Sequence, residues 1–306
     1  MRPLFRSGGL ALLTLLLASC VRYDDGLQAF QNKDYDRAFA RWQLLAKFGD
    51  PKAQNELGWL YEHGLGVTPD ASEAAKWYRK AAEKGLPVAQ NNLGILYQNG
   101  KGVGQDLAEA VRWFRMAADQ DEPSALNNLA VLIDNGRGVA EDNAEAAQLF
   151  QKAVDLGHPR AQNNLGLMYQ KGEGVPQDLT KAAALFKAAA ESGDPSAMNN
   201  YGVMLDNGRG VTVNRPEARK LFEEAARAGE ARAAVNLALT YLFDIPAGEQ
   251  PNQKLAYAWL NIAASQNNER ALQLRTELTS RLSEVEIAEA QSLSSQILAD
   301  RSVTPH

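Results

Sequence analysis

The sequence predicts an all-α fold, a solenoid of antiparallel helix pairs that is closed by a C-terminal capping helix. Three observations predict it. A block of sequence recurs every 36 residues, each block holds two apolar patterns at helical spacing, and a glycine-rich bend separates the two patterns. One helix pair cannot bury its own apolar stripe, so stacked neighbours must bury it jointly.

The first 19 residues are predicted to be an export signal that takes no part in the fold. Arg2 and Arg6 precede an apolar run of about ten residues, 8–17, which is shorter than the roughly 20 that span a membrane as a helix. The run ends in Leu17-Ala18-Ser19-Cys20, which resembles a bacterial lipobox. That resemblance implies a covalent diacylglycerol and fatty acid, such as palmitate, on Cys20. An ordinary signal peptide that happens to end beside a cysteine is the alternative.

The next segment, 20–27, is predicted to be a short lipid tether. It would keep the first helical pattern, near Gln28, within about 30 Å of the lipid at roughly 3.3–3.6 Å per extended residue. Val21, and not aspartate, follows the cysteine. By resemblance to enterobacterial sorting, this favours the outer membrane, with the protein facing the periplasm. No second apolar stretch approaches spanning length, so membrane attachment is expected through lipid only.

The charge balance argues against nucleic acid as a partner. Without the two signal arginines, the chain holds 30 Lys and Arg against 37 Asp and Glu, a net charge of −7. Binding to nucleic acid depends on cations that meet phosphates, which a mildly acidic solenoid supplies poorly. The only cysteine stands at the expected lipidation site, so no disulfide is expected in the mature fold.

The first helix of each repeat begins near an alanine and ends at a glycine-rich bend. Ala89, Leu93, Leu96 and Tyr97 fall at i, i+4, i+7 and i+8, which is one apolar stripe of a helix. Glycine ends such helices because it adopts positive φ without strain. The six copies start at Ala53, Ala89, Ala125, Ala161, Ala197 and Ala233, and the bends start at Gly64, Gly100, Gly136, Gly172 and Gly208.

The second helix opens with an aspartate or asparagine, and a glutamate follows three residues later in most copies. This spacing predicts a capping box, in which each side chain accepts the other residue's backbone N–H. Its first members are Asp70, Asp106, Asp142, Asp178 and Asn214. Trp77 and Trp113 occupy the same position of the second helix in successive repeats. We call such a set of equivalent positions a column. Both tryptophans are expected to pack in the core or between repeats. A further column, Gly58, Gly94, Gly166 and Gly202, is expected to allow close helix approach.

These residues resemble the Sel-one-like repeat (SLR), a relative of the tetratricopeptide repeat. The resemblance covers 51–266 and implies a right-handed superhelix whose concave surface binds proteins or peptides. Residues 28–50 look more like a tetratricopeptide-like N-terminal unit. A longer, proline-containing loop replaces the bend around 244–252, and 267–306 is expected to form a C-terminal helical cap and tail.

The sequence predicts no enzyme, no cofactor beyond the lipid, and no metal. The three histidines, His63, His158 and His306, share no repeat position, and no hydrolase or metalloprotease motif appears. Some SLR proteins have been connected with β-lactam binding or hydrolysis. Those have paired cysteines in every repeat, which this chain lacks.

Two neighbouring columns of asparagine inside the first helices need a reason, because asparagine is a mediocre helix former. One holds Asn55, Asn91, Asn127, Asn163 and Asn199, and the next holds Asn92, Asn128, Asn164, Asn200 and Asn236. Helical angle places the Asn92 column beside the apolar stripe and the Asn91 column away from it. The amides could form hydrogen bonds to a neighbouring helix or to the glycine-rich bend. Alternatively, they could form hydrogen bonds to the backbone of a bound peptide. Asn92, Asn128, Asn164 and Asn200 are the candidate partner-binding residues.

The sequence as a whole predicts a non-enzymatic envelope lipoprotein that acts as a protein–protein interaction scaffold or adaptor. Its partner would be a protein or peptide in the cell envelope. A periplasmic regulator of a membrane signalling complex is the alternative. It would use the same surface, so the sequence does not separate the two.

Overall fold

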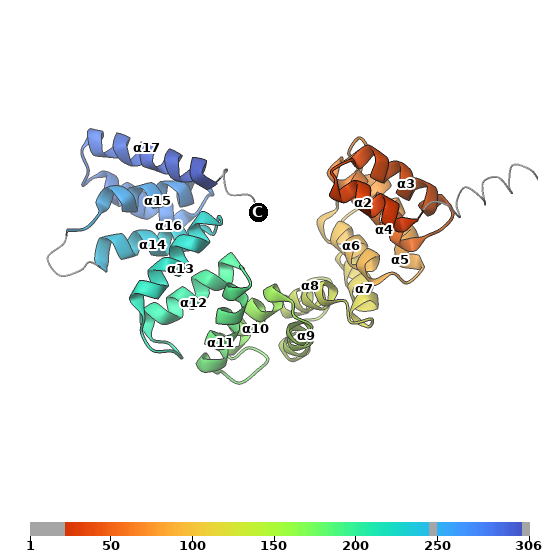
Figure 1. Ribbon diagram of the computed structural model, residues 1–306. Coiled ribbons are helices and arrows are strands. Elements are labelled where there is room, and N and C mark those ends of the chain that lie inside the picture. The colour runs from red at the N-terminus through yellow and green to blue at the C-terminus, as the bar shows by residue number, and fades with distance from the viewer. Residues whose placement is uncertain (1–21, 245–249, 302–306) are drawn as a thin grey trace, which may run out of the picture. The chain divides into compact units, whose positions relative to one another are not determined.

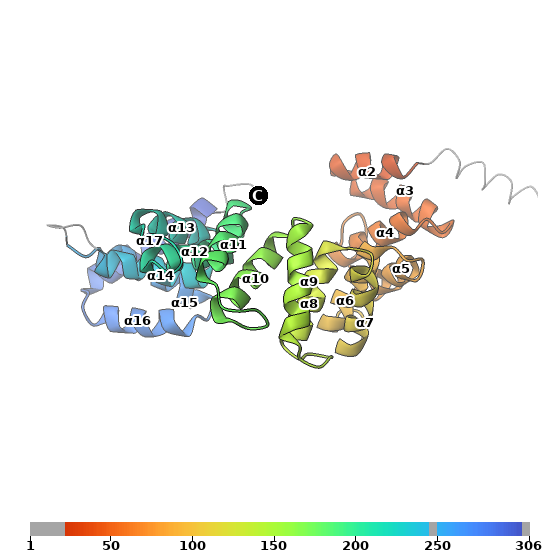
Figure 2. The same ribbon diagram turned by 90° about the horizontal axis from the view of Figure 1, so that it is seen from below.

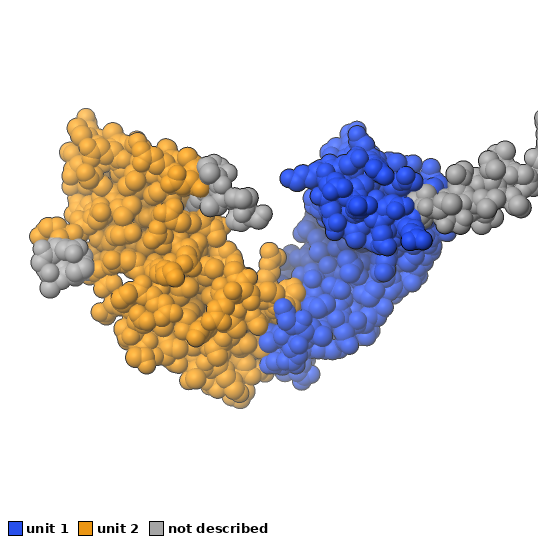
Figure 3. Space-filling view, viewed as in Figure 1, with its two compact units in different colours: residues 1–157 blue, residues 158–306 orange. Residues whose placement is uncertain are grey.

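The computed structural model describes residues 22–244 and 250–301, and within them it has sixteen helices and no strand (Figure 1). The all-α prediction is confirmed. Cys20 and His306 lie outside the described residues. The chain divides into two compact units, 1–157 and 158–306, which are coloured separately in Figure 3.

Within each unit, successive helices pack as pairs, and each pair packs against the next, as two views show (Figures 1 and 2). Unit 1 contains α2 (Tyr23–Gln31), α3 (Tyr35–Lys47), α4 (Pro51–His63), α5 (Ala71–Glu83), α6 (Pro87–Asn99), α7 (Leu107–Ala118), α8 (Pro123–Asp134) and α9 (Asn143–Asp155). Unit 2 contains α10 (Pro159–Lys171), α11 (Leu179–Glu191), α12 (Pro195–Asn207), α13 (Arg215–Arg227), α14 (Ala231–Phe243), α15 (Gln253–Ser265), α16 (Glu269–Thr279) and α17 (Glu284–Arg301). The last two helices, α16 and α17, both pack on α15.

The N-terminal helix starts earlier than the sequence suggested. Helix α2 begins at Tyr23, inside the segment 20–27 that was expected to be a tether. Trp42 of α3 explains this, because its indole Nε1 donates to the Tyr23 carbonyl at 3.3 Å and its ring stacks on that of Tyr23. Gly26 lets the indole come close, since a Cβ there would overlap the Trp42 ring. Tertiary packing therefore extends the helix into a segment with little apolar periodicity.

The bends after the first helices form as expected, with glycine in the left-handed region. Gly100 ends α6 at φ 67°, and its N–H donates to the Leu96 carbonyl. The second glycine of the same bend, Gly102 at φ 71°, lies directly on the start of the preceding second helix. A Cβ on Gly102 would overlap the Ala71 carbonyl. The glycine thus lets each bend dock on the repeat before it.

In the capping boxes of the second helices, only one of the two expected hydrogen bonds forms. Asp106 accepts the N–H of Glu109 at 3.0 Å, as predicted. The returning bond does not form, because the Asp106 N–H donates to the Tyr97 carbonyl of the first helix. Glu109 instead accepts from Arg112. The backbone N–H groups of the equivalent cap residues Asp70, Asp142, Asp178 and Asn214 likewise donate to a first-helix carbonyl.

The core of the first five repeats centres on one aromatic ring of the second helix, directly after the tryptophan column. These rings are at most 2% exposed, and they belong to Tyr78, Phe114, Phe150, Phe186 and Phe222. Trp113 is buried as expected, whereas Trp77 is partly exposed under the Lys80 ammonium. The predicted close approach at the glycine column is confirmed, because a Cβ on Gly94 would lie 2.6 Å from the Phe114 ring.

His158 caps the first helix of unit 2, so we expect a pH-dependent cap there. Its Nδ1 accepts the Ala161 N–H at 3.2 Å, which only the unprotonated nitrogen can do. Burial, together with the charge of Arg160, lowers the pKa of His158 below its ordinary value of 6.5. As the pH falls through 6.5, His158 becomes protonated in the unfolded chain but is still neutral in the folded chain. The stability present above about pH 6.5 is therefore lost progressively down to the folded-state pKa.

The matched variant for this prediction is His158→Asp, because Asp194 caps α12 at the equivalent position through a 2.8 Å bond from Ala197 N. Between pH 7 and pH 5, melting temperature should fall more for the wild type than for the aspartate variant. His158→Ala should cost about 0.5–2 kcal/mol near neutral pH, as other lost helix caps do. Parallel melting curves for wild type and His158→Asp would contradict the assignment.

Candidate functional site

The two asparagine columns differ in burial, in the opposite sense to the one expected from helical angle. Members of the Asn91 column are 4–8% exposed, whereas the Asn92 column is half-buried. The expectation that the Asn91 column points away from the packed face is wrong. Helix α6 packs against second helices on both sides, α5 and α7, so its buried surface is wider than one apolar stripe.

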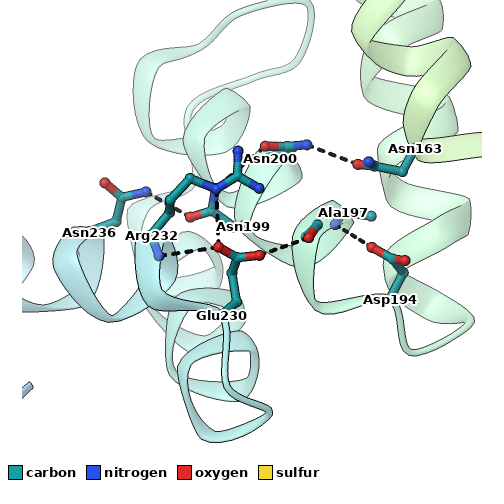
Figure 4. A network of polar contacts seen from close by, with 9 residues as sticks. Asn163, Asp194, Ala197, Asn199, Asn200, Glu230, Arg232 and Asn236 are labelled. Carbon is teal, nitrogen blue, oxygen red and sulfur yellow. Dashed lines mark hydrogen bonds and ion pairs between the residues drawn. The ribbon is translucent and has the colours of Figure 1, made fainter. Parts of the chain in front are cut away.

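The amides pair with one another between consecutive first helices. Asn92 Nδ2 donates to Asn55 Oδ1 at 3.0 Å, and Asn128 Nδ2 donates to Asn91 Oδ1 at 2.9 Å in unit 1. In unit 2, Asn200 donates to Asn163 at 2.9 Å and Asn236 donates to Asn199 at 2.8 Å (Figure 4). Asn164 is half-buried in the same column. We call these bonds the amide ladder. Of the two roles considered for the asparagines, they correspond to the one in which the amides bond to a neighbouring helix.

A double-mutant cycle on the ladder should show coupling between its partners. Asn91→Ala should cost about 1–2 kcal/mol and Asn128→Ala about 1 kcal/mol. The double variant should cost roughly 0.5–1.5 kcal/mol less than their sum, because both singles remove the same bond. Urea unfolding measures this. The control is Asn99→Ala, an exposed position of α6 that should change stability by no more than about 0.5 kcal/mol. Strictly additive losses would show that the amide pair does not stabilise the fold.

The ladder ends on a carboxylate at the N-terminal side. Glu56 takes the place of asparagine there and accepts the Tyr23 hydroxyl of α2 at 3.0 Å. Asn55 Nδ2 also approaches it, at 3.5 Å. Burial raises the pKa of Glu56, partly opposed by these hydrogen bonds. Glu56 thus ties the N-terminal helix to the first repeat.

A row of half-buried apolar side chains runs beside the ladder, one per repeat. The row consists of Trp59, Ile95 and Val131 in unit 1 and of Leu167, Val203 and Leu239 in unit 2. We call the ladder column that contains Asn92, together with this row, the first-helix face. The sequence predicted packing for the Trp59 column, and the structure shows that each side chain also keeps part of its surface open. Trp59 stacks on His63 with ring centroids 4.0 Å apart.

In unit 2 the first-helix face is hollowed into a groove of about 610 Å³ between α12 and α14. Val203, Leu239 and Phe243 supply apolar walls, and the Phe222 ring lies beneath them. At 75% exposure, Phe243 is the most exposed large apolar side chain in the described part of the chain. Asn236 lines the groove, whereas the candidates Asn92, Asn128, Asn164 and Asn200 do not.

The groove was not predicted, although one sequence signal was present. The last-turn column that contains Phe243 is polar in every earlier copy: His63, Asn99, Asn135, Lys171 and Asn207. The phenylalanine appears where the glycine bend is lost. An apolar residue at an otherwise polar column could have marked the position.

Polar contacts hold the two walls of the groove together. On its rim, Asp206 of α12 pairs with Arg215 at the start of α13, at 3.6 Å. At the other ends of α12 and α14, Glu230 accepts from Ser196 Oγ at 2.7 Å and from Arg232 Nε at 3.0 Å (Figure 4). Burial alone would raise the pKa of Glu230, but the bonds from Arg232 and Ser196 outweigh it and lower the pKa. The walls are thus fixed by side-chain bonds as well as by core packing.

The described residues offer no group of three or more His, Cys, Asp or Glu side chains that could hold a metal ion. No helix in 22–244 or 250–301 is long and apolar enough to cross a membrane.

Comparison with known proteins identifies the repeats. The family model for the Sel1 repeat matches six contiguous segments, 51–86, 87–122, 123–158, 159–194, 195–230 and 231–268. The fold is similar to the crystal structure of a Sel1 repeat protein from Oxalobacter formigenes. That protein is 32% identical, with a TM-score of 0.73 over 79% of this chain and 96% of the other.

Two further relatives have a stated role. A protective antigen of uropathogenic Escherichia coli strains, which displays an SLR fold, is 29% identical, with a TM-score of 0.68 over 91% of this chain and 60% of that one. The chitin synthase regulator SKT5 of Saccharomyces cerevisiae is 44% identical over 68 residues, which are 22% of this chain. The aligned part is only 10% of the yeast protein's length.

Proposed function

Since the chain belongs to the Sel1 repeat family, we propose that it is a non-enzymatic envelope lipoprotein that holds a protein partner on its first-helix face. Sel1 repeats generally mediate contacts between proteins. The observation that carries the proposal is the groove between α12 and α14, where Phe243 is left 75% exposed. An apolar hollow with a few polar groups suits a partner's side chain, and a large exposed apolar residue is typical of an interaction site.

The test is partner capture with two matched variants. Phe243→Ser removes the exposed apolar wall, and Val285→Ser removes another exposed apolar side chain, 68% exposed on α17. The tagged protein is cross-linked and isolated from its own envelope. Phe243→Ser should lose the partner, while Val285→Ser and the wild type retain it at equal abundance. Retention by Phe243→Ser would exclude the groove as the binding site.

Lipid anchoring at Cys20 is part of the proposal. Helix α2 begins at Tyr23, so only Val21 and Arg22 separate it from the cysteine. At roughly 3.3–3.6 Å per extended residue, the first helix would stand no more than about 10 Å from the lipid, closer than the sequence alone suggested. The partner would then be at the membrane or recruited to it, on the periplasmic side of the outer membrane.

Intact-mass analysis of the mature protein tests the anchor. Acyl chains should be found on Cys20, and Cys20→Ala should release the protein into the soluble fraction. A mature form without fatty acid, or one that starts at another residue, would refute this part of the proposal. That result would not bear on the groove as the site of partner binding.

Regulation of a membrane complex is the second candidate, and the name of the yeast relative, a regulator of an enzyme, favours it. A regulator and a scaffold would both use the first-helix face. They differ in one measurement. Once the partner is known, adding the purified chain should change its activity if the chain is a regulator, and should change only its location if the chain is a scaffold.

A further inference from the structure

A second groove lies on unit 1, away from the first-helix face. Its volume is about 370 Å³, and it is formed by α5 and the bend after α6. Ala75 and Val103 form an apolar floor, and Lys76, Arg79 and Lys80 surround it. The docking of Gly102 on Ala71 fixes the bend against the helix. Both walls are therefore set by the packing of two consecutive repeats.

The charges around this α5 groove are unbalanced. Lys76 pairs with Glu73 at 2.6 Å. Arg79 donates to the Tyr97 hydroxyl, and the Lys80 ammonium lies 3.7 Å from the centre of the Trp77 ring. Neither Arg79 nor Lys80 has a carboxylate within ion-pair distance among the residues that the structure describes. One carboxylate lines the groove, that of Glu83.

Other repeats neutralise the cations that occupy the same two columns. Arg115 pairs with Glu145 at 3.5 Å, Lys152 pairs with Asp121, and Lys187 pairs with Glu191 at 3.9 Å. Helix α5 is the exception, in a chain whose net charge is negative. Its uncompensated cations border an apolar floor, and that combination is complementary to an acidic ligand with an apolar side chain.

We propose that the α5 groove binds an acidic segment of a protein, with an apolar side chain on Ala75 and Val103 and a carboxylate beside Arg79 and Lys80. A recess of this size admits one or two side chains, whereas a flat bilayer surface does not reach its floor. The groove uses the second helix and the bend, so it is independent of the first-helix face. Together with the first-helix groove of the proposed function, it gives the chain a second, separate binding site.

The test starts from selection with a displayed library of random peptides on the mature full-length chain carrying Cys20→Ser. Peptides lost when Arg79→Gln and Lys80→Gln are combined should share Asp or Glu next to an aliphatic residue. The affinity of the best synthetic peptide should fall at least about tenfold in that double variant, and should weaken as salt is raised. Phe243→Ser should leave this affinity unchanged, which separates the result from the first-helix groove.

The matched control combines Arg115→Gln with Lys152→Gln, the paired cations of the equivalent columns. It should change the affinity less than about twofold, and thermal melting should confirm that both double variants are folded. An equal loss of affinity in the control would overturn the proposal, because it would show that removing any two positive charges weakens binding. Selection without an acidic consensus would overturn it as well. So would binding to phosphatidylglycerol vesicles without binding to any acidic peptide.

Discussion

Replacing Phe114 by alanine should lower the free energy of unfolding by about 3–5 kcal/mol. The ring is fully buried in α7 and faces Gly94 of α6, which has no side chain to move into the space. The neighbouring helices are held by the repeats on either side, so the cavity can collapse only in part. Urea unfolding of the mature chain measures the loss.

Two comparisons make the Phe114 prediction specific. Phe114→Leu should cost less than the alanine variant, because it keeps most of the buried volume. Phe243→Ala removes the same atoms from an exposed side chain and should change stability by no more than about 0.5 kcal/mol. A loss below about 1 kcal/mol for Phe114→Ala would show that the ring does not hold the helix pair together.

Replacing Gly102 by alanine should destabilise the protein by about 2–5 kcal/mol, for two additive reasons. The residue has a φ of 71°, which costs an L side chain roughly 1–2 kcal/mol. Its Cβ would also overlap the backbone of Ala71, which has to move, at a typical overpacking cost of about 1–3 kcal/mol. Because the bend joins two repeats, their interface should loosen first.

Two other glycines of the same unit separate these causes. Gly85 has a φ of 85° with nothing within 4 Å of its Cβ position, so Gly85→Ala should show the conformational cost alone. Gly104 lies in the same bend as Gly102, with open space around it and no positive φ. Gly104→Ala should be within about 0.5 kcal/mol of wild type. Equal losses at Gly85 and Gly102 would show that the contact with Ala71 adds nothing.

The repeat and its local structure could be predicted from the amino-acid sequence alone. Periodicity, the Gly100-type bends and the Asp106-type caps are short-range features, because they depend on φ preferences and on hydrogen bonds within a few residues. The close approach at the Gly94 column was also predictable. Glycine inside a helix costs stability, so its repetition at one position indicates that another helix packs closely there. The expectation of a protein-binding solenoid followed from this pattern, and the expectation of no catalysis rested on three histidines that share no repeat position.

The partner of each polar group depends on how the helices pack, and it could not be predicted from the sequence. Asn91 is more buried than Asn92 because helices on both sides cover α6, which a single helical projection omits. The N–H of Asp106 bonds to a first-helix carbonyl that lies nine residues earlier in the sequence but next to it in space. The exposure of Phe243 and the unpaired charge of Arg79 depend in the same way on which neighbours are present. Burial and ion pairing are properties of packed helices, so they appear only when the repeats are stacked.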